Sequence, residues 1–304
     1  MTIFFSAHFP SAPFAGRSRH GPYGDSVLEL DAAVGRLLRL LAELKIDQQT
    51  LVYFSSDNGG HLEEVNSRTG RREGGSNGLL RGGKGHGAME GGIRVPAFLR
   101  WSSVLEPREK ILDVPTSQMD LFPTLLEVAG VQQKEKEGAN LDGKSILSLL
   151  VGNSTERRSP HQYLFHYCGT YLHGLRWIED REHVWKVYFF TPKYKEEGRE
   201  EKCPFVCMCY GEEHVIEHRP PLVYNIAADL SERSSKGALA PGSEQYQRVI
   251  RQVERAVDEH RGSLSSSKEE EVVELQFSFR NTVWKPWLQP CCGGLLKACH
   301  CGGQ

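Results

Sequence analysis

The feature that most constrains the fold is an amphipathic run followed at once by a short β-rich run. Apolar residues recur at spacings of three and four over positions 26–45, and Ser26 and Glu29 have the spacing of a helix capping box. Residues 50–54 are then typical of a strand. A helix followed by a strand predicts half of a parallel α/β unit, in which ligands bind at the carboxyl ends of strands.

Two hard oxygen donors, Asp57 and Asn58, stand at the carboxyl end of this predicted strand. Ca²⁺ and Mg²⁺ prefer such oxygens, but Ca²⁺ takes roughly six to eight of them, so most ligands would have to come from elsewhere. An Asx turn is the more ordinary explanation of an Asp-Asn pair. His61 could face the same pocket, whereas Glu63 and Glu64 are typical of a solvated, acidic start of a helix.

A glycine-rich segment follows, with ten glycines between positions 66 and 92. Such a loop either is disordered or brings the backbone close to a ligand. Residues 78–84 have the spacing G-x-x-x-x-G-K of a nucleotide-binding loop. Gly85 stands where such a loop needs Ser or Thr, so nucleotide binding is disfavoured. Lys84 among glycines still suits an oxyanion, and a solvated surface lysine is the alternative.

The remainder of the chain completes a first unit and, from about residue 160, predicts a second, smaller one. Residues 95–101 resume a buried strand pattern and residues 117–126 begin another helix. An antiparallel sheet and a helix then follow, with runs at 163–167, 172–177, 184–190, 222–226 and 249–257. We expect two domains, 1–158 and 159–304.

The balance of charge excludes several classes of protein. The 304 residues include 37 Lys+Arg and 39 Asp+Glu and are 39% hydrophobic, as in a soluble globular protein and unlike a basic nucleic-acid binder. No apolar stretch reaches the roughly 20 residues that cross a bilayer, and residues 1–7 lack the basic n-region of a signal peptide. We therefore expect no nucleic-acid partner and no membrane span in this chain.

The cysteines nevertheless indicate an oxidising compartment. Eight of them lie after position 167, at Cys168, Cys203, Cys207, Cys209, Cys291, Cys292, Cys299 and Cys301. Zinc is disfavoured because the adjacent cysteines of the tail would ligate one ion awkwardly, so we expect disulfides. Asn153 begins a glycosylation sequon, which together with the cysteines favours a lumenal protein. A lumenal chain without a leader predicts that its true N-terminus lies before Met1.

The chain also carries a series of distinctive motifs. They are Phe14–Asp25, Ser56-Asp57-Asn58-Gly59, Gly75–Gly78, Gly83-Lys84-Gly85, Glu90–Pro96, Pro115–Thr124, Phe165–Cys168, Pro220–Tyr224 and Trp284–Cys292. In order and spacing they resemble the C-terminal portion of the sulfatase family, in the branch of the steroid sulfatases and arylsulfatases. The resemblance implies an alkaline-phosphatase-like α/β fold whose N-terminal part lies outside this chain, with a smaller C-terminal subdomain of antiparallel sheet and helix.

The chemistry that this resemblance implies is hydrolysis of a small-molecule or glycan sulfate ester with one bound Ca²⁺. In the family the nucleophile is a formylglycine, made from the cysteine of a C-x-P-S-R motif by a formylglycine-generating enzyme. Asp57 and Asn58 match two of the metal ligands, and Lys84 matches the lysine that contacts the sulfate. His8 is the candidate for the active-site histidine.

The departures from the family pattern limit what this chain can do alone. No cysteine here stands in C-x-P-S-R, and the early pair of Asp ligands is absent, so we expect an incomplete calcium shell and negligible turnover. The chain is then either part of an arylsulfatase of the ER or Golgi lumen, lysosome or exterior, or a catalytically inactive truncated paralogue or isoform with a binding or regulatory role. The resemblance also implies four disulfides: Cys168–Cys209, Cys203–Cys207, Cys291–Cys299 and Cys292–Cys301.

Overall fold

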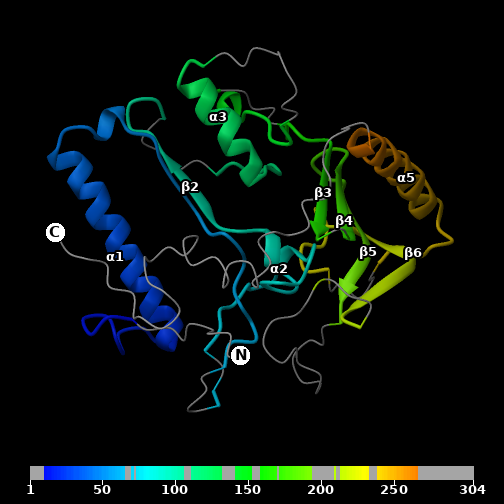
Figure 1. Cartoon of the computed structure of the whole chain (residues 1–304), viewed down its shortest axis with the longest axis horizontal. Helices are drawn as coiled ribbons and strands as arrows, with labels where there is room; N and C mark the ends of the chain where they lie inside the picture. Colours follow the sequence, from blue (N-terminus) through cyan, green and yellow to red (C-terminus); the bar gives the residue numbers. More distant parts are fainter. Residues whose placement is uncertain are drawn as a thin grey trace. The chain divides into compact units, whose positions relative to one another are not determined.

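The computed structural model divides into two compact units, 1–253 and 254–304 (Figure 1). It describes residues 10–65, 70–71, 73–105, 111–131, 141–152, 158–169, 171–193, 209, 213–232 and 238–265. Within these ranges, none of the helices combines the length and the apolar character needed to cross a bilayer.

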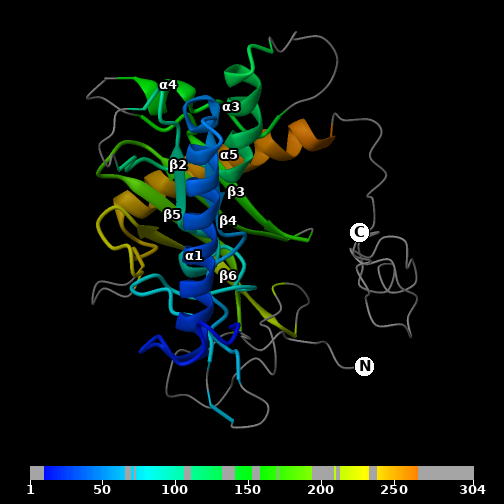
Figure 2. The ribbon, with the colours of Figure 1, turned by 90° about the vertical axis from the view of Figure 1, so that its left-hand side faces the viewer.

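The first helix, α1 (Gly21–Glu43), begins earlier than the sequence predicted (Figure 2). Pro22 stands in its first turn, where the missing N–H removes no helical hydrogen bond. The capping box was a wrong prediction, because Ser26 lies inside the helix and its Oγ donates to Pro22 O at 3.0 Å. The carboxylate of Asp25 instead accepts the N–H groups of Gly16 and Ser18 at 2.7 and 2.6 Å, which fixes the preceding loop on the helix start.

The apolar face of α1 is open in the described part of the chain. Leu30, Leu37 and Leu44 are 48, 50 and 58% exposed, although the sequence predicted that this face packs on a sheet. An apolar stripe of this kind marks a surface that another element covers in a complete fold.

Strands β1 (Val52–Ser55) and β2 (Ala97–Arg100) form a two-stranded antiparallel sheet, with Val52 opposite Arg100. The predicted parallel unit is therefore not what the described residues form, because β1 pairs with the strand that returns from the glycine-rich segment. Phe54 and Phe98 stack across the pair with ring centroids 5.0 Å apart. Phe98 remains 42% exposed, so β2 is less buried than predicted.

Short helices lie before β1, between β1 and β2, and between β2 and the second sheet. They are η1 (Asp47–Gln49), α2 (Glu90–Ile93), η2 (Gln118–Asp120), α3 (Leu121–Val128) and α4 (Leu147–Val151). The helix predicted at 117–126 is confirmed as η2 and α3. It begins in a true capping box, in which the Ser117 side chain accepts the N–H of Met119 and the Asp120 side chain accepts the N–H of Ser117.

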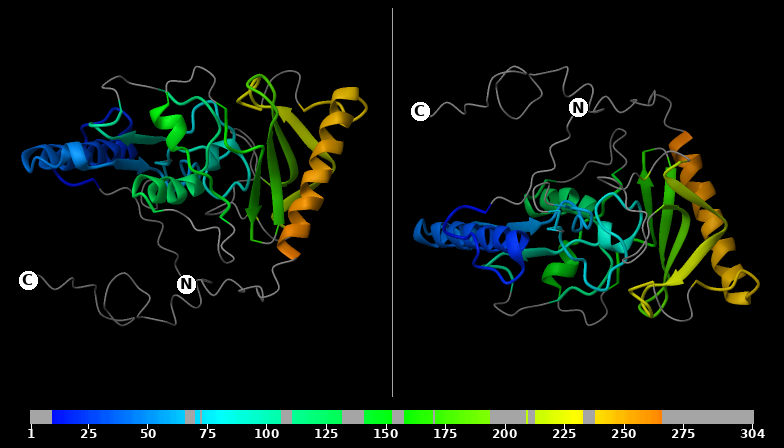
Figure 3. Two further views of the ribbon diagram at one scale, coloured as in Figure 1. Left: turned by 90° about the horizontal axis from the view of Figure 1, so that it is seen from above. Right: turned by 90° about the horizontal axis from the view of Figure 1, so that it is seen from below.

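The second sheet is antiparallel in the order β3-β4-β5-β6, as predicted (Figure 3). Its strands are β3 (Tyr163–Cys168), β4 (Tyr171–Ile178), β5 (Val184–Pro192) and β6 (Val215–Asn225). Only the second half of β6 was predicted, because Pro220 and Pro221 read as a break. Proline is tolerated on an edge strand such as β6.

The core of the first unit lies on both faces of this sheet. Val249 and Val253, from the first half of α5 (Glu244–Ser265), are fully buried, and Tyr246 Oη donates to Pro221 O at 2.8 Å. In Figures 1 and 3 the first half of α5 follows one face of the sheet, and the glycine-rich segment approaches the other. There Met89, 1% exposed, joins the apolar cluster of β5 and β6.

Candidate functional site

The end of β1 forms a turn that presents oxygen atoms. Asp57 Oδ1 accepts the N–H of Asn58 at 2.9 Å, and Asn58 Nδ2 donates to Gly59 O at 2.8 Å. Within the described residues, Asp57 Oδ2 and Asn58 Oδ1 receive no hydrogen bond. The Asp57 bond runs to the very next residue and not two residues on, so it is not the predicted Asx turn. The arrangement leaves two hard oxygens for a cation, which fits Ca²⁺ as far as two ligands can.

Close backbone packing joins this turn to the glycine-rich segment. Gly59 N–H donates to Gly92 O at 2.9 Å, and Lys84 N–H donates to Gly60 O at 3.1 Å. A Cβ on Gly59 would lie 1.7 Å from Gly91 O, so only glycine permits this approach. The glycine density therefore serves backbone contact inside the protein.

The side-chain amide of Asn77 also joins the Asp57–Asn58 turn to the glycine-rich segment. Its Oδ1 accepts the N–H of Gly60 at 2.8 Å, and its Nδ2 donates to Gly82 O at 2.8 Å. One side chain thereby ties the strand end to the loop that leads into Lys84.

The ammonium of Lys84 is the free cation of this loop. Its side chain is exposed and has neither an ion pair nor a hydrogen bond with any residue in the described ranges. The Asp57 side chain is exposed as well. The structure therefore joins the backbone of Lys84 by one hydrogen bond to Gly60, which follows Asp57 by three residues and Asn58 by two.

Buried hydrogen bonds close to Lys84 in sequence correct the prediction that the neighbouring glutamates are solvated. His86 Nδ1 accepts the N–H of Gly83 at 3.1 Å, so its Nε2 carries the proton and donates to Glu63 Oε1 at 2.7 Å. Burial alone would raise the pKa of Glu63, but the hydrogen bond from His86 holds that pKa below its usual range. Glu63 and Glu64 are therefore not the solvated start of a helix: their side chains are 7 and 10% exposed and flank His61.

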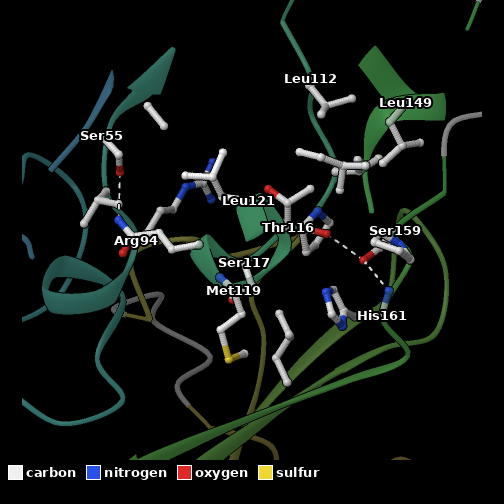
Figure 4. A pocket seen from close by; sticks show the side chains of 18 of the residues that line it. Ser55, Arg94, Leu112, Thr116, Ser117, Met119, Leu121, Leu149, Ser159 and His161 are labelled. Carbon is white, nitrogen blue, oxygen red and sulfur yellow. Dashed lines mark hydrogen bonds between the residues drawn. The ribbon is translucent and has the colours of Figure 1, made fainter. Parts of the chain in front are cut away.

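A cleft runs between β2, the α3 region and β3 (Figure 4). Asp57 and Asn58 are among its lining residues, whereas Lys84 is not. Deeper in the cleft, His161 Nε2 lies 2.7 Å from Asp120 Oδ1. The Ser159 hydroxyl links this pair to the chain by donating to Pro115 O (2.6 Å) and accepting the N–H of His161 (3.1 Å).

Several predicted site residues lie outside the described ranges. They are His8, Asn153, Cys203, Cys207, Cys291, Cys292, Cys299 and Cys301. Cys168 and Cys209 form a disulfide with their Cα atoms 5.9 Å apart. In the part of the chain that the structure describes, no group of three or more His, Cys, Asp or Glu side chains could hold a metal, so Asp57 and Asn58 could be at most part of a shell.

The sequence reasoning missed one charged cluster. Glu90, Arg176 and Lys186 meet in the interior, where Lys186 Nζ donates to Glu90 Oε1 at 2.9 Å and Arg176 Nη2 donates to the same oxygen. Two signals were available: Lys186 stands inside the apolar run of β5, and Arg176 inside that of β4. A charged residue in a fully buried strand needs a buried partner.

The fold and the motifs define the class of this protein. The Sulfatase family matches residues 5–131, and the family described as the C-terminal region of aryl-sulfatase matches residues 159–301. This chain belongs to the sulfatase family.

Its similarity lies in the steryl-sulfatase and arylsulfatase branch. Human steryl-sulfatase is 43% identical over 97% of this chain and 48% of its own length, and human arylsulfatase D is 44% identical over 98 and 48%. Human arylsulfatase A is 32% identical over 83% of this chain and 47% of its own length. The chain therefore spans about half the length of the curated relatives it matches.

Solved structures show the same fold. The PsFucS1 sulfatase from Pseudoalteromonas superposes with a TM-score of 0.67 and 21% identity, covering 88% of this chain and 48% of that one. A Bacteroides thetaiotaomicron protein of a locus for metabolism of multiple glycosaminoglycans superposes with a TM-score of 0.58 and 23% identity, over 84 and 48%. The predicted alkaline-phosphatase-like sulfatase fold is thereby confirmed.

Proposed function

We propose that this chain supplies part of the active site of a sulfuric ester hydrolase of the arylsulfatase type. The observation that carries the proposal is the hydrogen bond from Lys84 N to Gly60 O, which joins the loop of a free ammonium to the turn of Asp57 and Asn58. Hydrolysis of a sulfate ester requires positive charge beside the reacting oxyanion. Membership of the sulfatase family supports this reaction over other uses of such a site.

The residues present have distinct roles in this proposal. Asp57 Oδ2 and Asn58 Oδ1 would hold Ca²⁺, together with oxygens from outside the described residues. The ion, when bound, offsets negative charge on the sulfate and on the departing oxygen. The ammonium of Lys84 donates to a sulfate oxygen, while the neighbouring N–H of Gly83 is already bonded to His86 and takes no part.

The nucleophile has to come from elsewhere. None of the eight cysteines stands in C-x-P-S-R, so we propose that the formylglycine lies outside these 304 residues and depends on a formylglycine-generating enzyme. His8 is proposed as the active-site histidine. The chain alone is then expected to show negligible turnover.

The substrate and the compartment follow the same reasoning. We propose a small-molecule or glycan sulfate ester, and the 43% identity to steryl-sulfatase supports the former. The Cys168–Cys209 disulfide supports an oxidising location, in the ER or Golgi lumen, the lysosome or outside the cell. The missing nucleophile motif favours one second candidate, a catalytically inactive paralogue or isoform with a binding or regulatory role.

The test joins this chain to the half of human steryl-sulfatase that it does not match, and produces the chimera with the formylglycine-generating enzyme. We expect Ca²⁺-dependent hydrolysis of an aryl sulfate, lost in Asp57→Ala and Asn58→Ala but kept in Asp258→Ala, which removes an exposed carboxylate of α5. A folded, formylglycine-containing chimera without turnover would favour the second candidate. Clear turnover by the 304-residue chain alone would refute the argument about the nucleophile.

A further inference from the structure

Glu90 is the first residue of α2, and its carboxylate is fully buried against the second sheet. Its Oε1 accepts hydrogen bonds from Lys186 on β5 and from Arg176 on β4, which are 96 and 86 residues away in sequence. Lys186 and Arg176 are themselves 0 and 9% exposed. Both cations therefore have their partner on a different part of the fold.

The charges of this cluster are maintained by one another. Burial alone would raise the pKa of Glu90, but Lys186 and Arg176 hold that pKa far below its usual range, so the carboxylate is ionised. Burial lowers the pKa of Lys186 to about 8, and Arg176 contributes to this lowering, while Glu90 opposes it. Burial and the two cations also hold the pKa of His166 well below its usual range, so that imidazole adds no third positive charge.

The backbone beside Glu90 contacts both halves of the proposed site. Gly92 O accepts the N–H of Gly59, the residue after Asn58, at 2.9 Å. Gly91 N–H donates to Arg81 O at 2.7 Å, in the loop that leads to Lys84. A Cβ on Gly91 would lie 2.0 Å from Gly82 O, so α2 cannot shift without moving that loop.

We propose that Glu90 is a positioning residue, whose ion pairs with Arg176 and Lys186 fix α2 on the β3–β6 sheet and thereby hold the Asp57–Asn58 turn and the Lys84 loop in register. The value of this register for catalysis rests on the proposed function. Met89 also holds the segment through apolar packing, but such packing is non-directional, whereas two ion pairs to one oxygen select a single position.

The experiment measures hydrogen exchange of the full chain, without sulfate or Ca²⁺, in Glu90→Gln and in Glu232→Gln. Glu232 is a matched control, because it is 5% exposed and its carboxylate accepts the hydroxyl of Tyr188 on β5 at 2.6 Å, so glutamine can still accept that bond. We expect Glu90→Gln to speed exchange over residues 57–60 and 81–93 by about tenfold or more, and the control to leave these segments unchanged.

The double variant Glu90→Gln with Lys186→Met separates positioning from stability. It removes Lys186, one of the two cations that the single variant leaves without their carboxylate, so the unfolding midpoint should recover part of the way toward that of the unmodified chain, while exchange over 57–60 and 81–93 should stay fast. Recovery of slow exchange together with the midpoint would overturn the proposal, and so would unchanged exchange in both Glu90 variants. Because no ligand is used, these outcomes do not depend on whether the chimera hydrolyses sulfate esters.

Discussion

Replacing Gly59 by alanine tests how tightly the turn of the proposed site is packed on α2. The new Cβ would lie 1.7 Å from Gly91 O, 2.7 Å from Gly91 C and 3.2 Å from Gly92 Cα. All three atoms belong to backbone, so no change of rotamer can relieve the overlap. Non-bonded heavy atoms prefer about 3.5 Å, so the segments must separate by roughly 1.8 Å, which also breaks the hydrogen bond from Gly59 N to Gly92 O.

The size of the effect follows from these two losses. Overpacking costs about 1–3 kcal/mol and an unsatisfied buried N–H about 1–3 kcal/mol, so Gly59→Ala should lower the free energy of unfolding by about 2–6 kcal/mol. The matched control is Gly35→Ala on α1, where the new Cβ meets only Arg39 Nη1 at 3.5 Å and should raise stability by up to about 1 kcal/mol. Urea unfolding followed by the fluorescence of buried Trp185 measures both. Equal midpoints for Gly59→Ala and the unmodified chain would refute the reasoning.

Three further predictions concern single side chains. Burial would raise the pKa of Asp120, but hydrogen bonds from His161 and from backbone N–H groups hold that pKa below its ordinary value of 3.8. The ionised carboxylate therefore stabilises the folded state above pH 3.8, and this contribution is lost as the pH falls below that value. Acid unfolding of Asp120→Asn, followed by circular dichroism, should therefore lose less stability between neutral and acid pH than the unmodified chain. Lys84→Gln should change the free energy of unfolding in urea by no more than about 0.5 kcal/mol, because the exposed ammonium has no partner among the described residues. A larger loss would indicate a structural role for this side chain. Leu175→Ala, at a fully buried position of β4, should cost about 2–5 kcal/mol in the same assay, and a neutral result would contradict the described core.

The second sheet could be predicted because its strands carry their own signals. The runs at 163–167, 172–177 and 184–190 are rich in aromatic and β-branched residues and are separated by short polar turns. The first half of β6 was not predicted, because Pro220 and Pro221 interrupt the strand pattern. An edge strand tolerates proline, but the sequence does not show that β6 lies at the edge of the sheet. The described residues pair β1 antiparallel with β2 and contain no parallel partner for it, because pairing is a long-range choice that a short apolar run does not specify.

The candidate site could be predicted only in the residues that carry its oxygen ligands and its positive charge. Asp57, Asn58 and Lys84 were identified from their residue types, their position after a strand or among glycines, and the resemblance. Their supporting contacts were not, because the partners of Glu90 are 86 and 96 residues away and no local pattern joins them. Glu63 was misjudged for a related reason: an acidic residue reads as solvated unless its buried partner, here His86, is known.

The central claim is that the Lys84 ammonium and the Asp57–Asn58 turn are one half of a sulfate ester hydrolase site. The most direct test compares kcat/KM for an aryl sulfate between Lys84→Gln and Lys45→Gln in the chimera with human steryl-sulfatase. Both substitutions neutralise an exposed lysine whose ammonium makes no hydrogen bond or ion pair among the described residues. We predict a loss of about 100-fold or more for Lys84→Gln and a change within about twofold for Lys45→Gln. Equal activity of the two variants would contradict the claim.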